Sequence, residues 1–155
     1  MALAFVDDDV ITKYPIGSVE VRRKFPQVSF PADLENADLT AYGVVTVHNT
    51  AQPSIDSRTE RVEEGTPGFN GNQWNQVWNV ITLSPEEQQK ITDNKASYVR
   101  ADRNQRLADC DWTQLIDSPL DADAKLAWQL YRETLRMVPE QPGFPWNVEW
   151  PPLPA

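Results

Sequence analysis

The most regular alternation of apolar and polar residues lies near the middle of the chain, at residues 66–83. An Asn-Gly pair at 70–71 interrupts it, and this dipeptide favours the positive φ angles of a tight hairpin turn. After the turn, Trp74 and Trp78 fall at even spacing, so a continuous strand over 73–83 would place both indoles on one face. The pattern therefore predicts a β-hairpin with two tryptophans side by side.

The residues before this hairpin carry shorter apolar pieces. The clearest, at 42–47, is rich in β-branched residues and predicts a strand that ends next to His48. Residues 33–40 are compatible with one helical turn, and the alternation at 59–64 fits an exposed strand or a connecting arm. We therefore interpret residues 1–83 as a β-rich module of short strands.

A helix start follows directly. Ser84 can accept hydrogen bonds from the free amides of a first turn, Pro85 fits that turn without needing a donor, and Glu87 can reach back to the cap. These signals predict a helix over 84–109. Its apolar positions are sparse, so we expect most of this helix to face solvent.

A second, strongly amphipathic helix is predicted over 121–138. Asp121 can cap its first turn. The apolar residues that recur at helical spacing are Ala124, Trp128, Tyr131 and Leu135. From residue 139 onward, closely spaced prolines and aromatic residues predict an extended, partly polyproline arm instead of a helix.

Together these elements predict an α+β fold with two parts. Residues 1–83 form the β-rich module with the tryptophan-rich hairpin. Residues 84–155 form a helical hairpin, with helices at 84–109 and 121–138, followed by an extended Pro/Trp C-terminal tail.

Charge limits the partners of the chain. Its 155 residues carry a formal net charge of -9 at pH 7, which repels phosphate backbones and anionic lipid headgroups. No stretch approaches the roughly 20 apolar residues of a membrane span. The first residues lack the basic start and apolar run of a signal peptide. We therefore expect no nucleic-acid or membrane partner, and a protein that stays where it is made.

The residue types that usually carry chemistry are scarce or poorly placed. A single cysteine and a single histidine, Cys110 and His48, allow neither an internal disulfide nor a Cys/His zinc site. Cys110 lies between two aspartates, which disfavour a reactive thiolate. Asp121 and Asp123 resemble a catalytic acid pair, but a helix start favours acidic residues anyway. We expect no catalytic site, no cofactor and no metal.

Tryptophans and arginines are the remaining candidates for recognition. The pairs Trp74/Trp78 and Trp146/Trp150 fit three roles that the sequence leaves open: core packing, protein contact or sugar stacking. Four arginines lie one helical turn apart in two pairs, and they fit either salt bridges to Asp109, Asp111 or Glu133 or partner recognition. These arginines are Arg100, Arg103, Arg132 and Arg136.

The last third of the chain carries a series of short motifs in fixed order. They are Arg100-x-x-Arg103, Asp111-Trp112-Thr113-Gln114, Pro119-Leu120, Trp128-x-x-Tyr131-Arg132-x-x-Leu135-Arg136 and Trp150-Pro151. In order and spacing they resemble the C-terminal region of phage tail fibre assembly chaperones. Cys110 departs from that family, where a small residue or serine is usual. The Tyr-Gly-Val strand and the Thr-Leu-Ser-Pro-Glu-Glu helix start resemble the N-terminal module of such proteins.

The resemblance implies a non-enzymatic protein that binds a phage tail fibre protein and assists its folding, trimerisation or attachment. It would act in the host cytoplasm during assembly, with retention in the virion tail left open, as is its oligomeric state. We expect Trp112 to pack against Trp128 and Tyr131 and so to join the two helices. The expected partner-binding residues are Arg100, Arg103, Trp112, Trp128, Tyr131, Arg132, Trp146 and Trp150.

Two other functions fit the same sequence. The first is a permanent virion component, such as a fibre or baseplate adaptor. The second is a carbohydrate-binding module that uses Trp74 and Trp78 to stack on glycans. An enzyme is the least favoured interpretation.

Overall fold

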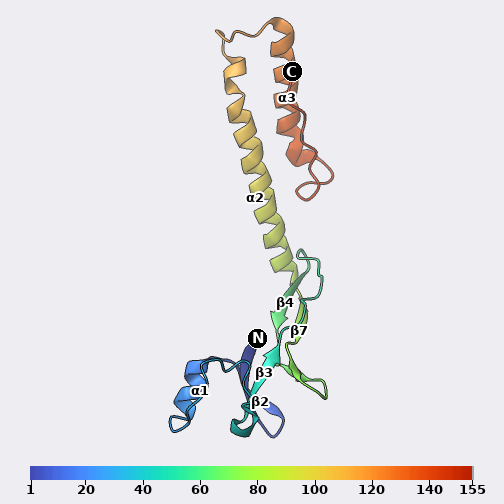
Figure 1. Ribbon diagram of the computed structural model, residues 1–155. Helices are drawn as coiled ribbons and strands as arrows, with labels where there is room; N and C mark the ends of the chain where they lie inside the picture. Colours follow the sequence, from blue (N-terminus) through green and yellow to red (C-terminus); the bar gives the residue numbers. More distant parts are fainter. Residues whose placement is uncertain (155) are drawn as a thin grey trace. The chain divides into compact units, whose positions relative to one another are not determined.

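A computed structural model describes residues 1–154 (Figure 1). The chain divides into two compact units, Met1–Thr82 and Leu83–Ala155, here called unit 1 and unit 2. Unit 1 holds all of the strands, and unit 2 holds the two long helices. The predicted α+β class is confirmed.

Unit 1 contains a five-stranded sheet with the order β2-β1-β3-β6-β5. Its strands are β1 (Ala2–Asp7), β2 (Val10–Ile16), β3 (Val44–His48), β5 (Gly68–Phe69) and β6 (Trp74–Asn75). β3 and β6 run parallel, and the other neighbours run antiparallel. His48 ends β3, as predicted.

The first hairpin was not predicted from the sequence. β1 and β2 pair through a two-residue turn at Asp8 and Asp9, whose φ angles are 45° and 60°. Aspartate tolerates this left-handed region better than most residues, because its short side chain bonds to nearby backbone. The turn forms at two adjacent aspartates, and no Asn-Gly or Asp-Gly pair marks it in the sequence.

The core of unit 1 forms between the sheet and a short helix, α1 (Ser18–Lys24). Val21 of α1 is fully buried in the same cluster as Leu3 and Phe5 of β1. The connection to β3 shows no helical turn at 33–40, so that prediction is wrong. The Asp33 and Asp38 carboxylates accept hydrogen bonds from amides two residues ahead, which fixes turns instead.

The only helical turn in this connection is η1 (Thr40–Tyr42), and Gly43 follows it with a φ of 64°. A Cβ at this position would lie 2.8 Å from the carbonyl oxygen of Val6. The Val6 amide also donates to the Gly43 carbonyl, at 2.8 Å. Both the backbone angle and the close approach to β1 therefore require glycine here.

A separate two-stranded sheet pairs β4 (Glu60–Glu64) with β7 (Trp78–Thr82). The 59–64 segment is thus a strand, as one of its two interpretations held. The predicted continuous strand over 73–83 is wrong, because β6 ends at Asn75 and β7 starts at Trp78 in the other sheet. The break arises where the Gln76 amide bonds to His48 and the Gly65 amide bonds to Val77.

The two tryptophans consequently do not share one strand face. Trp74 packs on Phe69 across the β5–β6 hairpin, with ring centroids 5.4 Å apart. Trp78 instead donates its indole N–H to the Thr50 carbonyl, at 3.2 Å. The hairpin turn at 70–73 is as predicted, with Gly71 at a φ of 93°.

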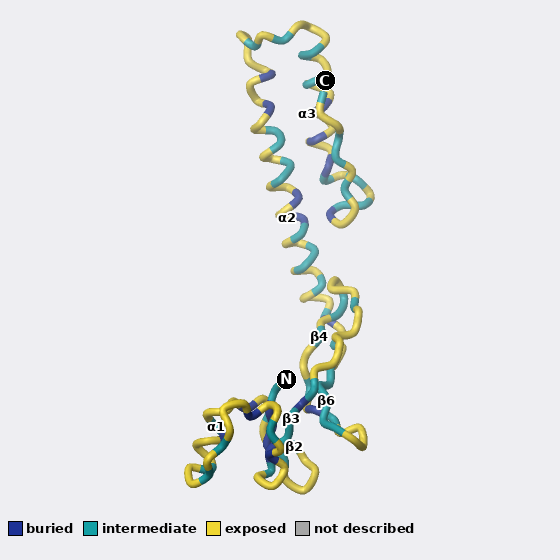
Figure 2. Tube along the Cα trace, in the orientation of Figure 1, coloured by how far each residue is buried: buried dark blue, intermediate teal, exposed yellow. Residues whose placement is uncertain are grey.

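Unit 2 begins with α2 (Pro85–Asp109). The predicted capping box is confirmed: the Glu87 amide donates to Ser84 Oγ at 3.2 Å, and the Ser84 amide donates to Glu87 Oε2 at 2.8 Å. Only Ala96 and Val99 of this helix are buried. Figure 2 shows α2 mostly exposed or intermediate, as its sparse apolar positions predicted.

The helical hairpin closes through η2 (Asp111–Gln114) and α3 (Ala122–Met137). The Asp121 carboxylate accepts from the Ala124 amide at 2.8 Å, as predicted for the cap of α3. The prediction of an extended arm from residue 139 is wrong for its first part. Helical geometry continues into η3 (Val138–Glu140), because proline fits an early position of a helical turn, and turns follow to residue 146.

Candidate partner-binding surface

A cluster of apolar side chains joins the two helices and the tail of unit 2. Cys110 from the end of α2 and Tyr131 and Leu135 from α3 are buried at its centre. The partly buried side chains of Leu107, Trp128 and Trp150 pack against them. Three segments that are distant in sequence therefore depend on one another for burial.

An aromatic row extends this cluster towards η2. Trp112 lies 6.3 Å from Trp128 between ring centroids, and Trp128 lies 5.6 Å from Tyr131 in an edge-to-face arrangement. Such pairs contribute about 0.5–1.5 kcal/mol each beyond the area they bury. The predicted packing of Trp112 on Trp128 is present, and it connects η2 to α3.

Arg132 connects the same elements through hydrogen bonds. Its guanidinium is 2.7 Å from the Asp111 carboxylate, and it donates to the Leu107 carbonyl at 2.8 Å and to Cys110 Sγ at 3.1 Å. Burial lowers the pKa of Arg132, but the bonds to Cys110 and Asp111 outweigh it and raise the pKa. A permanent cation thus sits at the C-terminal end of α2, where the helix dipole favours it.

The tail lies along α2, as two cation–π contacts show. The Arg100 guanidinium is 5.0 Å from the ring centroid of Phe144, and the Arg106 guanidinium is 4.3 Å from that of Trp150. The tail therefore advances in the same direction as α2 and returns beside α3 (Figure 1). Arg106 was not among the predicted residues, although Asp102 one turn earlier, which binds it at 3.1 Å, offered a local signal.

Two hydrogen bonds of the Gln141 side chain also hold the tail in a loop. The Gln141 side chain donates to the Glu149 carbonyl at 2.8 Å and accepts from the Glu149 amide at 2.9 Å. One amide side chain thus replaces a pair of backbone bonds across eight residues. This arrangement places Trp150 against the cluster without any regular secondary structure in the tail.

The eight predicted partner-binding residues divide by exposure. Tyr131 is buried, and Trp128, Arg132 and Trp150 are partly buried within unit 2. Trp112 and Trp146 remain 47% and 39% exposed. Arg100 is exposed and stacks on Phe144, while Arg103 is bonded to Asn104 and to the Arg136 carbonyl. A partner can contact the exposed members, whereas the others shape the surface from within.

The opposite face of α3 carries apolar side chains that the sequence analysis did not select. Leu126, Leu130 and Met137 are each more than half exposed, at 55%, 56% and 58%. At 100° per residue they fall on one stripe, away from the buried stripe of Tyr131 and Leu135. Both apolar stripes of α3 repeat with helical spacing. The sequence pattern alone therefore does not show which of the two is buried.

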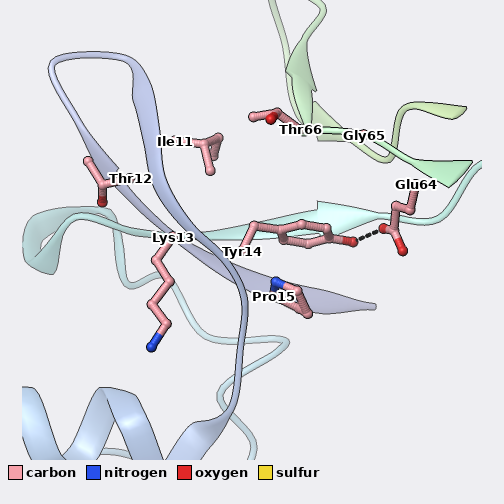
Figure 3. Close-up of a pocket in the computed structure, with 8 residues that line it drawn as sticks. All are labelled: Ile11, Thr12, Lys13, Tyr14, Pro15, Glu64, Gly65 and Thr66. Atoms are coloured by element: carbon pink, nitrogen blue, oxygen red, sulfur yellow. Dashed lines mark hydrogen bonds between the residues drawn. The ribbon is translucent and has the colours of Figure 1, made fainter. Parts of the chain in front are cut away.

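Unit 1 contains a cavity of about 490 Å³ between β2 and the end of β4 (Figure 3). Tyr14 of β2 points across it, and its hydroxyl donates to Glu64 of β4. Gln76 donates to the same carboxylate at 2.7 Å, and the Thr50 hydroxyl donates to the Gln76 carbonyl at 2.8 Å. This network ties the two sheets of unit 1 together.

We expect Tyr14 to make the stability of unit 1 sensitive to alkaline pH. Burial, and then the hydrogen bond and charge of Glu64, raise the pKa of Tyr14 from 10.0 to about 12. The folded state therefore holds this proton more tightly than the unfolded state. The contribution of the Tyr14 hydroxyl to the free energy of unfolding is complete below about pH 10 and disappears by about pH 12. Urea unfolding between about pH 9 and 11.5 should show that the free energy of unfolding falls more steeply with pH for the wild type than for Tyr14→Phe. Parallel losses would contradict the assignment.

Over residues 1–154, no group of three or more His, Cys, Asp or Glu side chains is placed to hold a metal ion. Over the same residues, no helix combines the length and apolar character needed to cross a membrane.

Comparison with known proteins finds a family match for the C-terminal segment. Residues 96–155 match the family model described as phage tail assembly chaperone protein. The match starts within α2 and includes η2, α3 and the tail, which are the segments that meet in the apolar cluster. No curated protein and no solved structure matches the chain. The resemblance to tail assembly chaperones is thus confirmed for residues 96–155.

Proposed function

We propose that this chain is a tail fibre assembly chaperone, which binds a phage tail fibre protein and assists its folding, trimerisation or attachment. The observation that carries the proposal is the family match over residues 96–155, which points to a chaperone role in tail assembly. The tail fibre as the particular partner is our extension, drawn from the motifs of the same segment.

The surface of unit 2 supports a protein-binding role. A folding assistant needs apolar side chains that a partner can cover, held on a scaffold that does not collapse over them. On α3, Leu126, Leu130 and Met137 are exposed, while Leu135 is completely buried; Trp112 of η2 is exposed as well. The scaffold and the contact surface therefore use different faces of α3.

We further propose that the protein acts by binding alone, without catalysis or a cofactor. Two charged residues of unit 2 that could suggest chemistry have structural roles: Asp121 caps α3, and Arg132 of α3 binds Asp111 of η2. The proposed place of action is the host cytoplasm during assembly.

Co-expression tests the proposal directly. The fibre gene that neighbours this chain in its source genome is expressed alone, with the full chain, and with an unrelated acidic protein of similar size. We expect soluble, trimeric fibre only with the full chain, measured by sedimentation and chemical cross-linking. Fibre that is equally soluble and trimeric in all three cultures would refute the proposal.

The same experiment separates two modes of action. Soluble trimer without lasting co-purification indicates a chaperone that leaves after assembly. Stable co-purification, together with the chain in purified virions, indicates a component retained in the tail.

A further inference from the structure

The segment that joins α2 to α3, residues 111–118, exposes large apolar side chains and is here called the hairpin tip. Trp112 and Leu115 are 47% and 56% exposed, and Ile116 is 100% exposed. Burying an aliphatic side chain stabilises a fold, and a fully exposed isoleucine contributes none of that stabilisation. An apolar group of this size at the end of a helical hairpin marks a surface that a partner can cover.

The tip is held in a fixed conformation. Thr113 is completely buried, and its hydroxyl donates to the Cys110 carbonyl at 2.7 Å. The Leu115 amide bonds to the Trp112 carbonyl, and the Ser118 amide bonds to the Leu115 carbonyl, at 3.3 and 3.2 Å. The exposed side chains are therefore presented on an ordered backbone, which lowers the entropy lost on binding.

The charged residues within the tip and adjoining it in sequence are all aspartates. Residues 109–123 include five aspartates and neither lysine nor arginine. Asp111 is offset by Arg132 from α3, and Asp121 caps that helix. Asp117 and Asp123 are exposed, and neither carboxylate has a hydrogen-bond or ion-pair partner within the described part of the chain. An apolar surface with this acidic rim is complementary to apolar side chains flanked by cations.

We propose that the hairpin tip docks a segment of the fibre protein in which apolar side chains are flanked by lysine or arginine. The identity of the partner rests on the proposed function, whereas the chemistry of the segment follows from the tip itself. Tip-to-tip pairing of two copies is disfavoured, because it would bring the same acidic rims together. An anionic lipid surface is disfavoured for the same reason.

Synthetic peptides test the chemistry without the fibre. Two amphipathic peptides share the same leucines, and one carries lysines where the other carries glutamates. We expect the lysine peptide to shift the backbone amide resonances of residues 112–118 in the full chain, and the glutamate peptide to leave them unchanged. The acidic turn at 7–9 is an internal control for binding by charge alone. Equal shifts at 7–9 and at the tip, or no shifts at the tip, would overturn the proposal.

Fibre capture then tests the location. The variant Leu115→Ser/Ile116→Ser removes the apolar tip, and Val10→Ser/Val19→Ser removes two valines that are similarly exposed, at 63% and 65%, in unit 1. We expect at least a tenfold loss of fibre affinity for the first variant and none for the second. Undiminished capture by the tip variant would overturn the docking site while leaving the chaperone proposal intact. If the wild type captures no fibre, the peptide titration alone tests the docking site, and co-expression still tests the chaperone proposal separately.

Salt dependence tests the acidic rim. Exposed charges are screened over about 8–10 Å at physiological ionic strength, so capture by the wild type should weaken as salt is added. Asp117→Asn/Asp123→Asn should reduce that dependence. The control Asp93→Asn/Glu140→Gln, which removes the same charge elsewhere on unit 2, should not. If fibre capture by the two variants depends equally on salt concentration, the acidic rim has no role in binding.

Discussion

Replacing Trp150 with alanine is expected to detach the C-terminal tail and to lower the unfolding free energy of unit 2 by about 3 kcal/mol. Trp150 packs against the buried cluster around Leu135, and it also forms the ring on which the Arg106 guanidinium lies at 4.3 Å. Its loss leaves a cavity beside the cluster and removes an aromatic anchor near the end of the tail. Amide hydrogen exchange at residues 99–109 of α2, and in the tail, would measure the effect.

Trp146→Ala is the matched control, because Trp146 has the same side chain in the same tail but is 39% exposed. We expect this variant to change the unfolding free energy by less than about 1 kcal/mol. If both variants accelerate exchange equally, the cluster does not anchor the tail.

The comparison also matters for binding studies. Trp146 and Trp150 were both predicted to contact a partner, and changing them together would combine a surface change with a folding change. Weaker fibre capture by Trp150→Ala must therefore be compared with its stability, whereas the same loss in Trp146→Ala would report on the surface.

The features that sequence alone predicted well are those whose causes are local. The Ser84 capping box and the Asp121 cap depend on residues three positions apart, and both are present. The hairpin turn containing Gly71 was found in the same way, because positive φ selects glycine. The α+β class followed from the placement of these local signals.

The features that escaped prediction depend on distant parts of the chain. Even spacing suggested one strand through Trp74 and Trp78, but hydrogen bonds from Gln76 to His48 and from Gly65 to Val77 divide it between two sheets. No local pattern carries information about those partners. The tail was predicted to be extended, but local backbone hydrogen bonds, such as that from the Trp146 amide to the Gly143 carbonyl, form its turns. The contact between Gln141 and Glu149, eight residues apart, then closes these turns into a loop.

The sequence predicted which side chains of the candidate surface lie together, but not which of them are exposed. Helical spacing correctly brought Trp128 and Tyr131 together, and the separate expectation that Trp112 packs on Trp128 is also met. It could not tell that Trp150 packs inward, or that Leu130 and Ile116 remain uncovered. Two apolar stripes on one helix have the same period, and only the position of the neighbouring segments decides which is buried.

Arg132→Ala is expected to lower the unfolding free energy of unit 2 by about 2 kcal/mol, because hydrogen bonds to charged groups contribute about 1.5–3 kcal/mol. This guanidinium binds Asp111, the Leu107 carbonyl and Cys110, so one side chain connects α3 to η2 and to the end of α2. Its side chain is only 12% exposed, whereas that of Asp111 is 66% exposed. The carbonyl and sulfur contacts, which solvent screens less than the ion pair, should account for most of the loss.

Two further variants separate geometry from charge. Lysine at position 132 keeps the cation but lacks the planar fork that reaches three acceptors, so Arg132→Lys should recover less than half of the lost stability. Arg136→Ala removes an exposed arginine one turn later on α3 and should change the unfolding free energy by no more than about 0.5 kcal/mol. Chemical denaturation followed by tryptophan fluorescence measures all three, since Trp112 and Trp128 lie beside the contact. Full recovery by lysine would show that charge at the helix end, and not the fork, holds η2 in place.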